Sequence, residues 1–434
     1  MKKLLPLLIT TALGINAAWA DNLAEIYDLA KQNDPQLLSA AAQREAAFEA
    51  INSSRSTMLP QIDLQAGYNI RQSSLSSRDS NSLTAGVGLK QELYKRSSWL
   101  NLKQTEKKAR EIDSDYAAQQ QNLILRVAKA YFEVLKAQDS LDFVRAEKAA
   151  VARQLEQTKQ RFEVGLSAIT DVHDAQAQYD SVLASEVLQE NTLANSYEAL
   201  REITGEEHQK IAVLDTKRFS ADRPEASTQA LIEQAQQENL ALLTKRIAQD
   251  IARDSISLAY SGHLPSLTLD SGYNFTNVSG TEGGIGNGSF NEFNIGVTLH
   301  VPLYTGGNTT SLTKKAEAEY IKASQDLEKT YRSVVKDVRA YYNNINANIG
   351  AIRAYNQSMI SAQSALEATE AGFDVGTRTI VDVLDSTRRL YDANRNLSDA
   401  RYNYILSVLE LRQAVGTLSE QDIVDINAGL KSVS

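Results

Sequence analysis

Proline placement is the feature that most constrains how this chain can fold. The prolines are Pro6, Pro35, Pro60, Pro224, Pro265 and Pro302. Two long stretches therefore contain no proline, one between Pro60 and Pro224 and one after Pro302. Because proline breaks the interior of a helix, these two stretches permit very long helices.

Both proline-free stretches carry a heptad pattern. In the first, a row spaced by seven residues runs through Val127, Val134, Leu141, Lys148, Leu155 and Phe162. In the second, the matching row runs through Val338, Ile345, Ile352, Met359, Leu366 and Phe373. Such a pattern indicates helices packed side by side as coiled coils. One helix from Ser97 to Phe162 would span about 100 Å, several times the thickness of a bilayer, so these helices should project away from any membrane domain.

The two stretches belong to an internal duplication. Residues 59–69 match residues 264–274 at an offset of 205, with six of eleven positions identical. Residues 162–174 match residues 373–385 at an offset of 211. A nearly constant offset across separate segments predicts two repeats of one plan, residues 21–219 and 220–434.

Each repeat is expected to run helix, strand, strand, long helix, shorter helix. The first repeat should have strands at about 60–73 and 82–94, a long helix at about 97–163 and a shorter helix at about 168–204. The second should have strands at about 265–277 and 290–303, a long helix at about 308–373, a shorter helix at about 379–416 and a C-terminal segment.

The predicted strands alternate apolar and polar residues, as in Ile62-Asp63-Leu64-Gln65. Segments of about ten residues with one apolar face are typical of membrane β-barrels, whereas a soluble sandwich would show more than four such strands. Four strands cannot close a membrane barrel, for which about eight is the minimum. Copies of the chain must therefore share one barrel, and the pattern alone does not decide between two copies and three.

The N-terminus indicates export. Lys2 and Lys3 precede an apolar run, and Ala18-Trp19-Ala20 is a small-x-small cleavage pattern, so residues 1–20 are predicted to be a signal peptide cut before Asp21. Without Lys2 and Lys3 the chain has 43 basic and 54 acidic residues, which argues against nucleic acid as a partner. The chain has no cysteine and so no disulfide. No later segment is apolar enough for a transmembrane helix.

Several segments carry a resemblance to a known family. These are residues 161–172 (RFEVGLSAITDV), 343–347 (NNINA), 376–385 (GTRTIVDVLD) and 400–404 (ARYNY). With them, nearly the whole mature chain resembles the TolC family of outer-membrane efflux and secretion channels. The resemblance implies a mixed fold in a homotrimer, with four strands per chain sharing a twelve-strand membrane β-barrel and the long helices forming an α-helical coiled-coil barrel.

The same resemblance implies a location and partners. The chain would lie in the outer membrane of a Gram-negative bacterium, in contact with outer-membrane lipid, with a long periplasmic extension. A periplasmic adaptor protein and an inner-membrane transporter would join it in tripartite drug efflux and type I protein secretion. Its cargo would be drugs, detergents or proteins, and the channel would use no cofactor, metal or catalytic residue.

Two aspartates are candidates for a channel constriction. Gly165 and Gly376 follow the long helices and are expected to reverse the chain. Asp382 and Asp385 would then lie near the start of the return helix on one face. Acids there also interact favourably with the helix dipole, so capping is an alternative explanation for them, as it is for Asp171 and Asp174. In a trimer they would form stacked acidic rings, which suit cation selection, and the resemblance places the narrowest point at these two residues.

The resemblance also implies polar links that hold the helix turns together. Arg378 matches an arginine whose partners correspond to Thr170 and Asp171, and Gln154 with Glu370 matches a weaker link. Phe373 stands where the family commonly has a tyrosine whose hydroxyl joins the latch, and phenylalanine cannot donate that hydrogen bond. Either Arg378 carries more of the latch here or another group substitutes, although packing at the seam alone also accounts for Phe373.

Two other classes of function remain as alternatives. A surface or periplasmic coiled-coil structural protein, such as an adhesin, would share the long helices but conduct no ions. An outer-membrane enzyme would need a nucleophile and a base, and no such pair is evident. The histidines have no metal-ligand spacing; they are His173, His208, His263 and His300.

Overall fold

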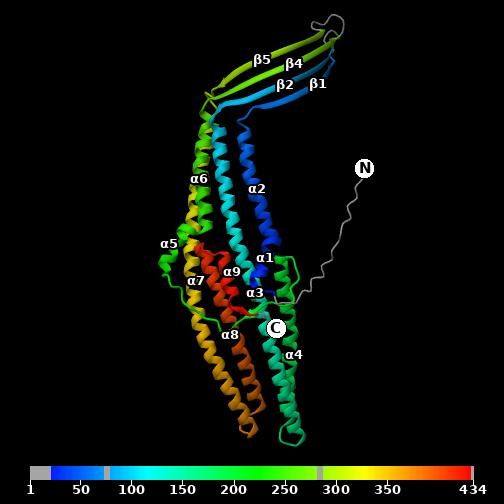
Figure 1. The fold of residues 1–434 in the computed structure, drawn as a ribbon, viewed down its shortest axis with the longest axis vertical. Coiled ribbons are helices and arrows are strands. Elements are labelled where there is room, and N and C mark those ends of the chain that lie inside the picture. The colour runs from blue at the N-terminus through cyan, green and yellow to red at the C-terminus, as the bar shows by residue number, and fades with distance from the viewer. Residues whose placement is uncertain (1–20, 73–78, 281–286, 432–434) are drawn as a thin grey trace, which may run out of the picture. The chain divides into compact units, whose positions relative to one another are not determined.

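The computed structural model describes residues 21–72, 79–280 and 287–431 (Figure 1). The predicted signal peptide lies outside these residues. The chain divides into two compact units, each assembled from separate segments. The strand-bearing unit comprises residues 39–119 and 233–336, and the helical unit comprises the described parts of 1–38, 120–232 and 337–434. Each unit therefore draws on both predicted repeats. The long helices α3 (Arg96–Glu163) and α7 (Asn308–Asp374) each contribute their first part to the strand-bearing unit and their last part to the helical unit.

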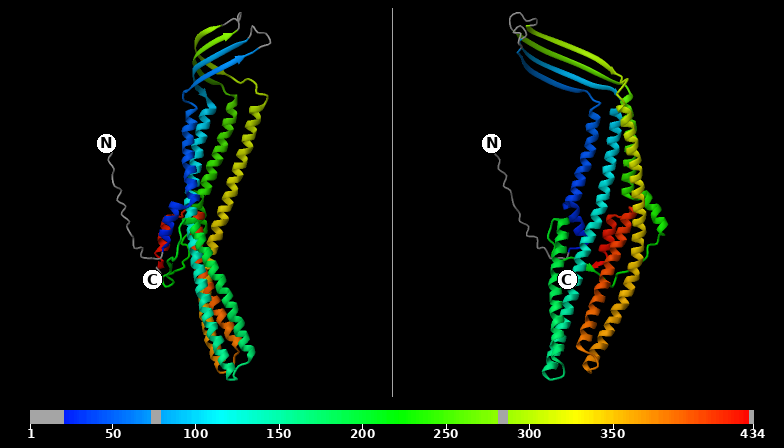
Figure 2. Two further views of the ribbon diagram at one scale, coloured as in Figure 1. Left: turned by 90° about the vertical axis from the view of Figure 1, so that its right-hand side faces the viewer. Right: turned by 180° about the vertical axis from the view of Figure 1, so that it is seen from behind.

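The strand-bearing unit contains one antiparallel sheet of order β1-β2-β4-β5. Its strands are β1 (Gln61–Arg71), β2 (Ser80–Lys95), β4 (Ser266–Gly280) and β5 (Gly288–His300). Figure 2 shows these four strands side by side in one curved sheet. The strand predicted at about 290–303 ends at His300, two residues before Pro302, because proline has no N–H to donate to a strand ladder.

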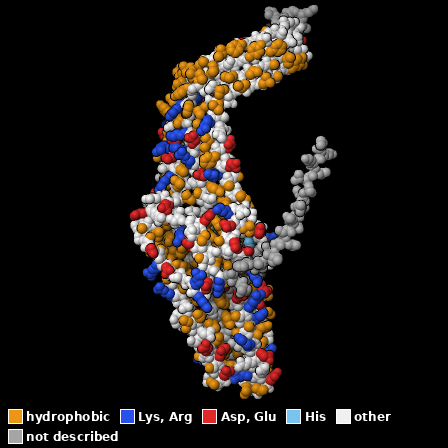
Figure 3. Space-filling view, viewed as in Figure 1, with side chains coloured by type: hydrophobic (Ala, Val, Ile, Leu, Met, Phe, Trp, Pro, Cys, Tyr) orange, Lys and Arg blue, Asp and Glu red, His pale blue; other side chains and the backbone are white. Residues whose placement is uncertain are grey.

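The sheet leaves its apolar side chains uncovered. Leu64 is 78% exposed, and Phe293 and Ile295 are each 67% exposed. The apolar surface of the strands stands out in Figure 3. Among the described residues, β1 and β5 each pair with only one strand, so both edges of the sheet keep free backbone groups.

Helices precede the strand pair in each half of the chain. They are α1 (Leu23–Asn33), α2 (Pro35–Ser56), α5 (Thr228–Glu238) and α6 (Leu240–Tyr260), with a short 3-10 turn η2 (Ser261–His263). Where one helix was predicted before each strand pair, the structure has two. Asp34 adopts an extended conformation because it precedes Pro35, which disfavours helical backbone at the preceding residue. Asn239 ends α5 and caps α6, since its side chain accepts from Leu242 N.

The helical unit is built from four long segments. These are the last parts of α3 (Arg96–Glu163) and α7 (Asn308–Asp374), with the shorter helices α4 (Ile169–Thr204) and α8 (Ile380–Val415). All four contribute to a core cluster of Val144, Val151, Leu155, Ala175, Val182, Leu366, Ile380, Val383, Leu384 and Leu390. Within the described residues, no helix is both long and apolar enough to cross a membrane.

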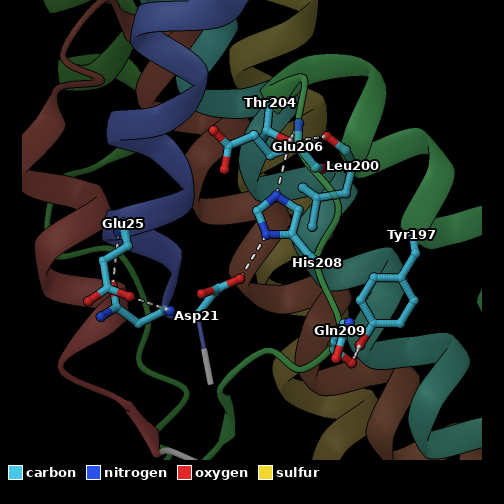
Figure 4. A network of polar contacts seen from close by, with 9 residues as sticks. Asp21, Glu25, Tyr197, Leu200, Thr204, Glu206, His208 and Gln209 are labelled. Carbon is cyan, nitrogen blue, oxygen red and sulfur yellow. Dashed lines mark hydrogen bonds and ion pairs between the residues drawn. The ribbon is translucent and has the colours of Figure 1, made fainter. Parts of the chain in front are cut away.

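Short elements close the helical unit. Helix α9 (Glu420–Asn427) precedes β6 (Leu430–Lys431), which pairs with β3 (Val213–Leu214). Figure 4 shows how Asp21 is held near them. Its carboxylate lies 2.8 Å from Nδ1 of His208, whose Nε2 lies 2.9 Å from the Thr204 hydroxyl. The buried His208 thus anchors the start of the described chain.

Candidate functional site

The two helix turns in the helical unit have the same backbone geometry. Gly165 and Gly376 have φ of 76° and 79°, in the left-handed region that favours glycine. A side chain would meet nothing within 4 Å at either position, so backbone conformation rather than crowding calls for glycine. Leu166 N donates to Arg161 O, and Thr377 N donates to Gly372 O, which satisfies carbonyls left free at each helix end.

Asp382 caps the start of α8. Its Oδ2 accepts from Thr379 N at 2.9 Å and from Thr379 Oγ1 at 3.0 Å, while its own N donates to Thr379 Oγ1. The backbone hydrogen bond from Thr379, aided by its hydroxyl and by the charge of Arg378, lowers the pKa of Asp382. Asp382 is therefore ionised at neutral pH, and capping accounts for part of its role.

Asp385 lies one turn further along α8 and faces two arginines. Its oxygens pair with Arg388 at 2.6 Å and Arg389 at 2.7 Å. Asp174 from α4 joins Asp382 and Asp385 in lining a groove of about 640 Å³ between α4 and α8. The structure thus brings both predicted constriction residues to one surface and adds a third carboxylate to them.

Arg378 makes no link to Thr170 or Asp171 within the chain. Its guanidinium has no hydrogen bond or ion pair to any described residue. Its backbone N donates to Gly372 O at 3.2 Å. A Cβ on Gly372 would lie 2.7 Å from Cγ of Arg378, so glycine is needed there to admit the arginine stem. Sequence reasoning missed Gly372, because no turn signal marks a glycine inside a helix.

Thr170 and Asp171, the predicted partners of Arg378, lie at the start of α4, where Asp171 is engaged by its own turn. Asp171 caps α4, since its Oδ2 accepts from Ser167 Oγ at 2.6 Å and from Ala168 N at 3.1 Å. Thr170 is exposed on the first turn of α4. Thr170 is therefore open to a group from outside the chain, and Asp171 is partly exposed beside it.

Phe373 is held by Arg161 instead of by a hydroxyl of its own. The Arg161 guanidinium lies over the Phe373 ring at 4.5 Å from its centre. It also donates to the carbonyls of Phe373 and Asp374 and lies 3.6 Å from the Asp374 carboxylate. A cation stacked on an aromatic face is attractive, so this contact ties α3 to α7 without a tyrosine. Arg161 was not predicted as a linking residue, because the pairing of positions across helices cannot be read from one sequence.

Gln154 pairs with α8 in this structure. Its Nε2 donates to Thr387 Oγ1 at 2.9 Å in a buried position, and its Oε1 has no partner among the described residues. Glu370 is exposed. Gln154 and Glu370 line the same cavity of about 400 Å³, together with Arg153 and Gln157, but no hydrogen bond joins them.

The chain matches a family described as "Outer membrane efflux protein" over residues 26–206 and again over residues 231–417. It is 73% identical to the outer membrane protein TolC of Vibrio cholerae serotype O1, covering 99% of each chain. It is 45% identical to the protein of that name from Escherichia coli K12, covering 99% of this chain and 90% of that one. A further relative is the alkaline protease secretion protein AprF of Pseudomonas aeruginosa, at 29% identity over 96% of this chain and 88% of that one.

Solved structures agree with the fold. The chain superposes on CusC with a TM-score of 0.79 at 17% identity, covering 92% of this chain and 93% of that one. It superposes on the CmeC outer membrane channel of Campylobacter jejuni with a TM-score of 0.78 at 17% identity, covering 94% and 90%. At such identities the likeness concerns the fold alone. The family match and the identities carry the assignment: this chain belongs to the outer membrane efflux protein family and is an outer-membrane exit duct for efflux and type I secretion.

Proposed function

We propose that three copies of the chain share one twelve-strand membrane barrel and one helical tube. The observation that carries this is the four-stranded sheet, whose two edge strands each lack a partner on their outer side among the described residues and whose apolar side chains are exposed. Edges in a membrane must be paired, so the sheet needs further strands. An eight-strand barrel from two copies would be filled by its own side chains, whereas a larger barrel leaves a lumen for cargo.

The outer face of α4 supports assembly as well. Leu183, Val187 and Leu188 are 40%, 60% and 66% exposed, and no other described element covers them. Burying such side chains against a second copy would contribute about 25 cal/mol per Å² of apolar area. The tandem match of the family to two segments is consistent with a duplicated plan, in which one chain supplies two strand pairs and two helix pairs.

Asp382 and Asp385 are proposed to form the constriction, with Asp174 beside them. In a threefold assembly the carboxylates of one groove would be repeated around the axis, and rings of acid select and bind cations. The lowered pKa of Asp382 keeps its charge at neutral pH. Asp385 would face the passage while it stays paired with Arg388 and Arg389, which would partly neutralise its charge.

Arg378 is proposed to hold the turns closed by reaching a neighbouring copy. Its guanidinium makes no hydrogen bond or ion pair with a described residue of its own chain and acts on Asp382 through its charge alone. On the other turn, Thr170 is exposed and Asp171 is partly exposed. Within one chain, Arg161 on Phe373 and Gln154 on Thr387 would add to the latch, with Glu370 at the rim of the same cavity. A periplasmic adaptor and an inner-membrane transporter would release the latch, and drugs, detergents or proteins would then pass without a cofactor.

Planar-bilayer recordings test this proposal. Asp382→Asn with Asp385→Asn should weaken block by a trivalent cation by about tenfold or more, because both ring charges are lost. Arg378→Gln should raise the conductance of the closed channel. Asp180→Asn, an exposed acid on α4 that accepts only from Gln176, and Lys159→Gln, an exposed base on α3, serve as matched controls. Unchanged block would move the constriction elsewhere, and a stable monomer by light scattering in detergent would contradict the shared barrel.

A further inference from the structure

The helix ends next to the sheet are basic, although the chain as a whole is acidic. We define the collar as four eight-residue segments at the helix ends nearest the strands, residues 51–58, 96–103, 253–260 and 308–315, all in the strand-bearing unit. The basic residues of the collar are Arg55, Arg96, Lys103, Arg253, Lys314 and Lys315, and its one acid is Asp254. Since the whole chain has a net charge of −9, this concentration of positive charge is local.

Half of the collar bases form no ion pair with any residue that the structure describes. Asp254 is nearly buried and forms ion pairs with Lys107 at 2.6 Å and with Lys103 at 3.6 Å. Arg253 pairs with Asp250 and Lys315 with Glu319. The remaining bases are exposed and have no ion pair with any described residue; they are Arg55, Arg96 and Lys314. The collar therefore presents free cations to its surroundings.

The collar also carries exposed aromatic and apolar side chains where the strands end. In the collar, Trp99 and Tyr260 are each 57% exposed, and in the adjoining segment between β5 and α7, Leu303 is 93% exposed and Tyr304 is 89% exposed. Figure 3 shows basic side chains gathered directly below the apolar strands. Tryptophan and tyrosine are enriched where a protein passes from hydrocarbon to headgroups, because their rings are partly polar.

We infer that the collar binds the headgroups of anionic phospholipids in the membrane leaflet next to the helices. The inference rests on the proposed placement of the sheet in the membrane. Eight helical residues span about 12 Å and the Debye length is about 10 Å, so the collar bases nearest the strands, such as Arg96 directly after β2, lie within a Debye length of the headgroup layer. Lysine and arginine at that depth are attracted to anionic lipid, whereas free phosphate would gain nothing from the adjoining aromatic residues. The collar thus selects lipid by charge as well as anchoring by its rings.

Trp99 offers a direct probe of the lipid beside the collar. The only other tryptophan is Trp19, in the predicted signal peptide, so the mature chain has one. Mature protein is reconstituted in vesicles that contain either brominated phosphatidylglycerol or brominated phosphatidylcholine, because bromine quenches tryptophan on contact. The binding constant of phosphatidylglycerol at Trp99, obtained from the quenching, should exceed that of phosphatidylcholine by about fivefold at low salt. This ratio should fall as salt rises.

Two matched triple variants test whether the preference for phosphatidylglycerol depends on the collar bases. Arg55→Gln, Arg96→Gln and Lys314→Gln together should reduce the ratio to within about twofold of unity. The control removes three exposed bases far from the strands, by Lys245→Gln, Lys329→Gln and Arg339→Gln, and should keep the wild-type ratio. Size-exclusion elution of both variants as the wild-type assembly verifies their folding. Trp99→Phe should abolish the signal.

The outcomes distinguish the lipid preference of the collar from the placement of the sheet in the membrane. Equal quenching of the wild type by both lipids overturns the lipid preference and leaves the membrane placement standing. No quenching by either lipid overturns the placement itself, and the proposed barrel with it. A preference that survives in the collar variant overturns the assignment to these three bases. Loss of the preference when an acidic peptide is added would identify a protein segment as the true occupant.

Discussion

Helices α4 and α8 have the same length and similar ends, but they differ in burial. Each has 36 residues and ends at a left-handed glycine, Gly205 or Gly416. Five residues of α4 are buried, against fourteen of α8. The equivalent first residues show the contrast directly, because Ile169 is 47% exposed and Ile380 is 1% exposed. The same local pattern therefore gives one helix a core position and leaves the other a free face.

The contacts of the two helices with α3 differ in the same way. Arg145 and Lys148 on α3 form ion pairs with Glu186 on α4, and the hydrogen bond from Lys148 lowers the pKa of Glu186. On α8, Ser398 and Tyr402 donate to Asp139 of α3, and burial raises the pKa of Asp139. One contact stabilises a charged carboxylate by ion pairs and the other buries a carboxylate that forms no ion pair with any described residue, so they should respond oppositely to acid.

The largest expected effect comes from truncating the equivalent isoleucines, Ile380 of α8 and Ile169 of α4, because these two side chains differ strongly in burial. Ile380→Ala should cost about 2–5 kcal/mol of unfolding free energy, because it opens a cavity in the core cluster. Ile169→Ala should cost less than about 1 kcal/mol, since its side chain is half exposed. Urea unfolding of the purified protein followed by circular dichroism measures both. Similar losses for the two variants would mean that α4 is as buried in the assembly as α8.

A smaller effect is expected at the helix caps. Thr379 caps α8 with its hydroxyl, whereas Ala168 occupies the same position of α4 with similar backbone angles and no side-chain cap. Thr379→Ala should therefore cost about 1 kcal/mol, and Ala168→Thr should recover about 0.5 kcal/mol in α4. The same urea titration serves as the measurement. If Ala168→Thr destabilised the protein, the two turns would not be equivalent.

The long elements were predictable because their signals are local. Proline spacing and heptads predicted a helix at about 97–163, and α3 runs from Arg96 to Glu163. The turns followed from Gly165 and Gly376, whose positive φ needs glycine. The family also followed from the sequence, since residues 161–172 and 376–385 carry the resemblance and the comparisons confirm it.

Contacts between helices were not predictable in the same way. The stacking of Arg161 on Phe373 and the bond from Gln154 to Thr387 depend on the register between helices far apart in sequence. Short elements such as α9 and the β3–β6 pair were missed because nonlocal pairing holds them. The roles of Asp382, Asp385 and Arg378 depend on neighbouring copies, and they remain predictions.

The smallest expected effect is the opposite pH response of the two α3 contacts. Asp139, with a raised pKa, binds its proton first in the folded state, so its contribution to stability rises as pH falls toward 3.8. Glu186, with a lowered pKa, contributes stability above 4.5 and loses it below, because only the unfolded state is readily protonated there. Asp139→Asn should therefore remove the gain in folding stability on mild acidification. Glu186→Gln should remove the loss of folding stability at lower pH. Unfolding midpoints measured from about pH 7 to about pH 3 separate them. Two variants with the wild-type profile would mean that neither contact controls the acid response, and that α4 and α8 differ in burial alone.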